Sequence, residues 1–345
     1  RNPAWSPDGK WISYISDING EFEIFLTKPD GSETKQLSND FESYRYEMKW
    51  SPDSKYILSS DKSMKLYYYS VPDGNRKEVA KSRSWEIRDY NWSPDSKWIV
   101  YTDNLNPNIS GVFIHSTASG KNELVTNKFF NASSGVFTPG GNFLFYTSSR
   151  SFNADINNLE WNYSYADMSK IYGVPLKKDT KSPFLFEGFA DKKEEEKKDE
   201  KDKKDNEVVV EIDFDGIKDR VFDVPTSAGN YYGLTPTKDH KMYYVKTGSG
   251  AKPATYVYDF TEQEEKQVGS FYQWDITPNA KNIFIKSGND YYIQKLADKI
   301  EVSAKDKIYL TNMETKISPR DEWLQIYSET WRQMRDFFYD PGMHG

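Results

Sequence analysis

Hydrophobic and polar residues alternate along most of the chain in short runs, which is the pattern of β-strands with two different faces. In the first run, Trp11, Ser13 and Ile15 fall on one side and Ile12 and Tyr14 on the other. Sustained helical periodicity occurs only near the C-terminal end. The pattern therefore predicts a protein built almost entirely of short strands.

One turn sequence recurs with nearly the same residues. The segments Trp5–Ile12, Trp50–Ile57 and Trp92–Ile99 share Trp-Ser-Pro-Asp-Gly/Ser-Lys, and their first residues lie 45 and 42 positions apart. Weaker copies are found at Phe137–Phe143, Leu234–His240 and Ile276–Asn282. Proline presets φ for the first central position of a turn, and Asp, Asn or Gly accommodate the next. Each copy therefore predicts a tight turn between two strands.

Each repeat also contains a second pair of strands. In the first repeat, the run Glu23–Thr27 is followed by the turn Pro29–Gly31. Four short strands in about 40–45 residues is the period of a propeller blade. A β-sandwich with turns that are similar by chance is the alternative, but a sandwich has no reason to repeat its sequence. The chain is predicted to be all-β, a β-propeller with six visible four-stranded blades, and the parent propeller is predicted to have seven.

Two segments interrupt the repeat between the fourth and fifth copies. Residues 190–207 enclose Asp191–Asn206, which has seven lysines, eight acidic residues and no apolar residue. Such a segment cannot bury anything, so it is predicted to be a solvated, mobile excursion from a blade edge. The aromatic-rich segment Asn153–Tyr165 is also predicted to be an insertion that decorates one face.

The last part of the chain has a helical pattern. Ser318 is placed as the N-cap, Pro319 at the first helical position, and Asp321 in the first turn, where its charge suits the helix dipole. Spacings of three and four put six apolar residues on one face: Trp323, Ile326, Tyr327, Trp331, Met334 and Phe338. We expect this amphipathic helix to dock through that face, either as a cap on the propeller or as part of another domain. Asp340–Gly342 then ends it.

Composition narrows the function classes. The 345-residue chain has a net charge of −7, which argues against nucleic acid as a partner, because phosphate binding requires a basic face. It has no cysteine, which excludes a disulfide scaffold and suits the cytoplasm or a periplasm. No run approaches the roughly 18 apolar residues of a membrane span. The sequence also starts and stops abruptly, and we expect it to be a fragment of a longer protein.

Candidate catalytic chemistry is sparse. A serine nucleophile needs a base within hydrogen-bond reach, and the chain has three histidines, His115, His240 and His344. No Gly-x-Ser-x-Gly elbow is present. We therefore predict no catalytic residue, no bound cofactor and no hydrolase activity of this chain by itself.

A calcium site is the obvious metal hypothesis. Asp213, Asp215 and Asp219 have the spacing of a calcium loop only in part, because Ile217 and Lys218 occupy positions that need an oxygen ligand and a glycine. The match fails, and the segment is predicted to be a surface turn with no metal.

Longer stretches of the chain carry a family resemblance. The Trp-Ser-Pro-Asp units resemble the TolB-like repeats of bacterial and archaeal propellers. Glu211–Val221, followed by Pro225 and Ala228–Leu234, resembles a signature of the second propeller of tricorn-type proteases. The tail Asp321–Pro341, ending in Met343–Gly345, resembles the start of the helical domain that follows that propeller.

This resemblance implies a serine peptidase that degrades oligopeptides, with its catalytic residues outside this chain. Residues 1–317 would then form a propeller that gates or channels peptides, and residues 318–345 would be the first helix of a helical cap domain. His344 would be structural. Peptide substrates, homo-oligomers of the parent and a cytoplasmic location, with the periplasm as the alternative, are the further expectations. Two alternatives stay open: a TolB-like scaffold that binds protein partners, and the propeller of a prolyl oligopeptidase.

Overall fold

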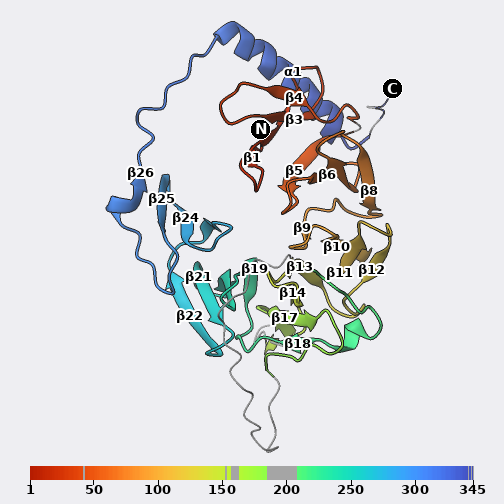
Figure 1. The fold of residues 1–345 in the computed structure, drawn as a ribbon, viewed down its shortest axis with the longest axis vertical. Helices are drawn as coiled ribbons and strands as arrows, with labels where there is room; N and C mark the ends of the chain where they lie inside the picture. The colour runs from red at the N-terminus through yellow and green to blue at the C-terminus, as the bar shows by residue number, and fades with distance from the viewer. Residues whose placement is uncertain are drawn as a thin grey trace, which may run out of the picture.

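The computed structural model describes residues 1–41, 43–151, 154–156, 163–184, 208–340, 342 and 344. Six four-stranded antiparallel sheets follow one another in chain order around a common centre, which confirms the predicted propeller (Figure 1). In every sheet the strands are adjacent in chain order, and the first strand of each blade lies nearest the centre.

The strands divide among the blades as follows. Blade 1 consists of β1 (Ala4–Trp5), β2 (Ile12–Ser16), β3 (Glu23–Thr27) and β4 (Thr34–Gln36). Blade 2 consists of β5 (Arg45–Trp50), β6 (Tyr56–Asp61), β7 (Lys65–Ser70) and β8 (Arg76–Lys81). Blade 3 consists of β9 (Tyr90–Trp92), β10 (Trp98–Asn106), β11 (Ile109–Ser116) and β12 (Asn122–Leu124).

Blade 4 consists of β13 (Ala132–Phe137), β14 (Phe143–Ser148), β17 (Lys170–Pro175) and β18 (Phe222–Asp223). Blade 5 consists of β19 (Asn230–Pro236), β20 (Lys241–Gly248), β21 (Ala251–Asp259) and β22 (Glu264–Gly269). Blade 6 consists of β23 (Gln273–Ile276), β24 (Asn282–Ser287), β25 (Asp290–Lys295) and β26 (Lys307–Ile308). The structure also contains two 3₁₀ turns, Ile217–Asp219 and Ala304–Asp306, and the helix α1 (Pro319–Phe337).

The recurring turn joins the first and second strands of a blade. In blade 2, the Ser51 hydroxyl donates to the Asp53 carboxylate at 2.6 Å and accepts the Tyr56 N–H at 2.9 Å. The Lys55 N–H donates to the same carboxylate at 3.1 Å. Ser54 has a φ of 61°, a left-handed conformation that favours glycine. These bonds explain why the repeat keeps Ser and Asp at fixed spacing and places Gly or a small residue next.

The alignment of the fifth copy on Thr235 and Pro236 is wrong by two residues. Pro236 is the last residue of β19, and the turn is closed by Thr237, whose N–H donates to the Lys241 carbonyl at 2.8 Å. The Thr237 hydroxyl donates to Asp239 at 2.5 Å, as Ser51 donates to Asp53. The hydroxyl residue that closes the turn locates it, and a Thr-Pro pair alone does not.

Successive blades are joined by five apolar core clusters, one at each junction. Between blades 2 and 3, for example, Leu58 and Tyr68 pack with Tyr90, Ile99 and Tyr101. Among the described residues no such cluster joins blade 6 to blade 1, and the chain after β26 crosses that side of the ring to reach α1 (Figure 1). A seventh blade remains a prediction.

Of the two segments that interrupt the repeat, the structure describes part of one. β15 (Ala154–Ile156) and β16 (Tyr163–Tyr165) form a separate two-stranded sheet between β14 and β17, which confirms an insertion in blade 4. The charged run 190–207 lies outside the described residues.

The helix forms as predicted; its apolar face is exposed in this chain, so docking through that face stays a prediction. Trp323 is 68% exposed and Tyr327 is 75% exposed, whereas Arg332 is buried. Arg332 pairs with Asp17 and donates to the Gly20 carbonyl at 3.1 Å, so the polar side of α1 rests on blade 1. Ser318 occupies the N-cap position without a side-chain capping bond. The loops of blade 1 present carboxylate and carbonyl oxygens. These oxygens bind the side of α1 that carries its arginines.

Candidate functional site

Polar side chains from blades 2 and 3 meet on the strands nearest the centre of the propeller. Lys49 on β5 donates from Nζ to the Asn91 side-chain oxygen on β9 at 3.2 Å. The negative charges of Asp89 and of Asp275, which lies on β23 of blade 6, also act on the Lys49 ammonium. The first strands thus bring charges from distant parts of the chain toward one another.

The protein environment shifts the pKa of both Lys49 and Asp275. Burial lowers the pKa of the Lys49 ammonium, and the carboxylates of Asp89, Glu47 and Asp275 offset that effect only in part. Burial raises the pKa of the Asp275 carboxyl, and the positive charge of Lys49 partly offsets the rise. Both groups are therefore incompletely solvated.

Asp89 has a fixed position between blades 3 and 4. Its Oδ2 accepts the Thr102 hydroxyl at 2.6 Å and the Ser134 N–H at 2.5 Å. Ser134 has a φ of 59°, next to a bulge in β13. A nearby hydrogen bond joins blades 2 and 3, in which the Trp92 indole N–H donates to the Lys49 carbonyl at 3.1 Å. Hydrogen bonds between neighbouring blades thus hold these residues in place.

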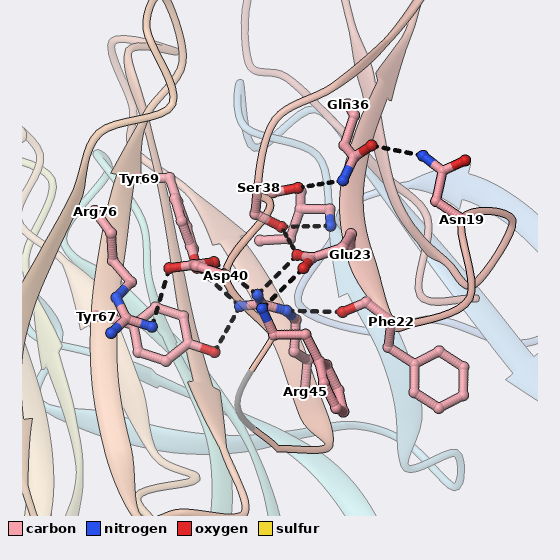
Figure 2. Close-up of polar contacts among 12 residues, drawn as sticks. Asn19, Phe22, Glu23, Gln36, Ser38, Asp40, Arg45, Tyr67, Tyr69 and Arg76 are labelled. Atoms are coloured by element: carbon pink, nitrogen blue, oxygen red, sulfur yellow. Dashed lines mark hydrogen bonds and ion pairs between the residues drawn. The ribbon is translucent and has the colours of Figure 1, made fainter. Parts of the chain in front are cut away.

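A buried arginine network lies at the junction of blades 1 and 2 (Figure 2). Arg45, at the start of β5, is 1% exposed. Its Nη2 donates to Glu23 at 2.8 Å and to Asp40 at 2.9 Å, and its Nη1 donates to the hydroxyls of Tyr67 and Tyr69 at 3.0 and 2.9 Å.

The Nε of Arg45 uses the fifth donor of the guanidinium on the Phe22 carbonyl, at 2.9 Å. Burial by itself lowers the pKa of Arg45, but Tyr67, Tyr69 and the two carboxylates raise it overall, so the side chain stays charged. The complete pairing of the Arg45 guanidinium indicates that the network fixes blade 2 against blade 1.

The three histidines have different surroundings. His115 on β11 is buried, and its ring bonds to the Asn122 side chain at 2.8 Å; burial lowers its pKa. His240 is an exposed turn residue with a φ of 59°. His344 bonds to Tyr339 and to Asp340. In the described part of the chain, none of these rings bonds to a serine hydroxyl.

The aspartates of the tested calcium pattern have basic or backbone partners. Asp215 pairs with the Lys178 ammonium at 2.6 Å, and Asp213 accepts the Lys178 N–H at 2.9 Å. Over the described ranges, no group of three acidic or histidine residues could hold a metal ion. The same residues contain no helix that is long and apolar enough to cross a bilayer.

The sequence analysis did not single out Lys49 and the polar residues around it. A signal was present on β5, where exposed Glu47 and half-buried Lys49 flank buried Met48. This alternation of polar and buried residues is typical of the first strand of a blade, because that strand lies next to the centre of the propeller. No pattern in the neighbouring residues indicated that the charge of Asp275 would act on Lys49.

These features define a β-propeller with polar side chains on the strands nearest its centre. The family model described as the tricorn protease second beta propeller domain matches residues 1–297, and that of the tricorn protease C1 domain matches residues 319–345. The chain belongs to the tricorn protease second beta propeller domain family.

Individual relatives agree with this assignment. A putative tricorn-like protease C-terminal subunit of Sulfurisphaera tokodaii is 25% identical over 97% of this chain and 38% of its own length. A tricorn protease homolog of Saccharolobus solfataricus is 23% identical over 94% of this chain and 30% of its own length. A crystal structure of the tricorn protease has the same fold, with a TM-score of 0.80 at 14% identity, covering 96% of this chain and 33% of that one. The chain thus spans between 20% and 38% of the length of the curated relatives that it matches.

Proposed function

We propose that this chain is the propeller of a tricorn-like serine peptidase and that its central channel admits short peptides to a catalytic centre elsewhere in the protein. The observation that carries the proposal is the match of two tricorn domain families in order, to residues 1–297 and then to residues 319–345. The proposal includes oligopeptide substrates, homo-oligomers of the whole protein and a cytoplasmic location, with the periplasm as the alternative.

The channel wall has the chemistry that such a filter requires. Lys49, Asn91, Asp89 and Asp275 present charges and hydrogen-bonding groups of both kinds, so a peptide backbone can pass without binding tightly to one patch. Selection would then depend on cross-section, because β-propeller blades held by close-packed junctions cannot widen greatly.

A narrowing variant of the full-length protein tests this role. Asn91→Trp places a large ring in the channel, and Glu78→Trp on β8, an exposed outer strand, is the matched control. We expect kcat/KM for octapeptides to fall severalfold more than kcat/KM for tripeptides in Asn91→Trp, with no change in the control. Equal effects on both substrate lengths would remove the gating role, and a full-length protein that cleaves no peptide would favour the scaffold alternative.

A further inference from the structure

A pocket lies at the rim of blades 3, 4 and 5, on the side of the propeller where α1 also rests. Its cavity volume is about 420 Å³, within the range of small-ligand sites, roughly 300–1,000 Å³. The walls come from the connection between blades 3 and 4, from the segment before β17, and from the start of β19. It is separate from the central charges around Lys49.

Aromatic rings form one side of this pocket and remain open to solvent. Phe129 is 80% exposed, Phe130 is 41% exposed and Tyr165 is 50% exposed. Neither phenylalanine stacks on another ring in the described part of the chain. Large exposed apolar side chains that gather around a cavity mark interaction sites, and aromatic faces attract cations as well as apolar groups.

A single carboxylate lines the same pocket. Asp167 is the one charged residue among the pocket-lining residues that the structure describes. Its Oδ1 accepts the Asn230 amide at 3.0 Å, and its Oδ2 accepts the Ser249 N–H at 2.7 Å. Asp167 has a φ of 53°, a sparsely populated conformation that the surrounding bonds maintain.

The two hydrogen bonds hold the carboxylate without neutralising it. The Ser249 N–H and the Asn230 amide lower the pKa of Asp167, so its charge is present at neutral pH. Each carboxylate oxygen has two acceptor positions, and the protein uses one on each. A fixed anion beside exposed aromatic rings is complementary to an ammonium or guanidinium group.

We propose that this pocket binds a positively charged group of a peptide, held between Asp167 and the rings of Phe129 and Phe130. The inference rests on the proposed function for the identity of the ligand as a peptide. Two sources share the chemistry, a lysine or arginine side chain and a free amino terminus. The pocket would thus give the propeller a preference for charge in addition to the size selection of its channel.

The test measures peptide binding to this chain by calorimetry and by saturation-transfer NMR. The probes are acetyl-Ala-Lys-Ala-amide, its glutamine analogue, and Ala-Gln-Ala-amide with a free amino terminus. The lysine probe is expected to bind at least about tenfold more tightly than the acetylated glutamine probe. Tighter binding of the third probe would identify the amino terminus as the source.

Two pocket variants and one control complete the experiment. Asp167→Asn keeps the size of the side chain and a residue type that tolerates this φ, and Phe129→Ala removes a ring that is 80% exposed, so both should fold. Asp73→Asn makes the same charge change at an exposed turn that also accepts a backbone N–H, from Asn75. We expect about tenfold weaker binding in both pocket variants and unchanged binding in the control.

The outcomes separate this inference from the gating proposal. Equal binding of all probes, or unchanged binding in Asp167→Asn, would overturn the pocket inference even if the channel variant alters size selection. Cation binding that depends on Asp167, together with a channel variant without effect on size selection, would leave the pocket intact and remove only the gating role.

Discussion

At the scale of single residues, Arg45 shows how a buried charge is tolerated. All five of its N–H donors have acceptors, and its partner Glu23 is 4% exposed. Burying a charge is costly unless it is paired and hydrogen-bonded. The network is therefore sensitive to the loss of one member, because the other charges stay in place.

We predict that Arg45→Met lowers the free energy of unfolding by about 3–5 kcal/mol, since it leaves Glu23 buried and uncompensated. The measurement is urea unfolding followed by fluorescence. Adding Glu23→Gln should recover part of the loss. Lys10→Met is the control, because Lys10 pairs with Asp8 at an exposed site, and it should change stability by less than about 0.5 kcal/mol. An equally small effect of Arg45→Met would contradict the structural role of the network.

At the scale of elements, α1 shows that an amphipathic pattern does not specify which side packs on a neighbour. Arg335 makes a two-pronged bond to Glu21 at 2.6 and 2.9 Å, and Gln325 donates to Asp17 at 2.7 Å. Phe337 adds one aromatic contact with Tyr44, with ring centroids 4.9 Å apart. The other apolar residues of the helix stay exposed, so the docking is mainly electrostatic.

We predict that Asp17→Asn combined with Glu21→Gln releases α1 from blade 1. Amide hydrogen exchange over 319–337 should accelerate at least about tenfold, because charge-assisted bonds that are partly buried contribute roughly 1.5–3 kcal/mol each. Raising the salt concentration to about 1 M should accelerate exchange in the unmodified chain by screening the same pairs. Asp30→Asn, in an exposed turn of blade 1, is the control. Unchanged exchange in the double variant would show that Phe337 and Tyr44 hold the helix.

At the scale of the whole molecule, the blades are stabilised by their neighbours. β14 in blade 4 contributes Leu144 and Tyr146 to the junction with blade 3, and Phe145 to the junction with blade 5. β24 in blade 6 contributes Ile283 and Ile285 to the junction with blade 5, while Phe284 on its other face is 36% exposed. A blade with one packed face has less buried apolar area to resist local opening.

We predict that amides of β24 exchange with solvent faster than those of β14, although both are second strands of four-stranded sheets. Hydrogen exchange with mass spectrometry measures both strands in one sample. In a longer protein with a seventh blade between blades 6 and 1, the difference should disappear. Equal protection in this chain would mean that blade 6 gains its stability in another way.

Much of the fold could be predicted from sequence because its causes are local. The turn bond of Ser51 with Asp53 and the alternation along each strand both act over a few residues, so the alternation recurs in every repeat and the turn bond in all blades but the fourth. The number of described blades, the insertion between β14 and β17 and the position of α1 all follow from such patterns. The fifth turn was misaligned because Thr237 and Asp239 preserve the bonds without the proline.

The sequence by itself thus determined the repeating unit, the strand order and the location of the C-terminal helix. Only the tertiary structure decided which side chains meet: Lys49 with Asn91, Asp167 with Asn230, and Arg332 with Asp17, which are 315 residues apart. Strand and turn formation depends on neighbours along the chain. Partnerships around a ring depend instead on how the blades close on one another, and no local pattern records that geometry.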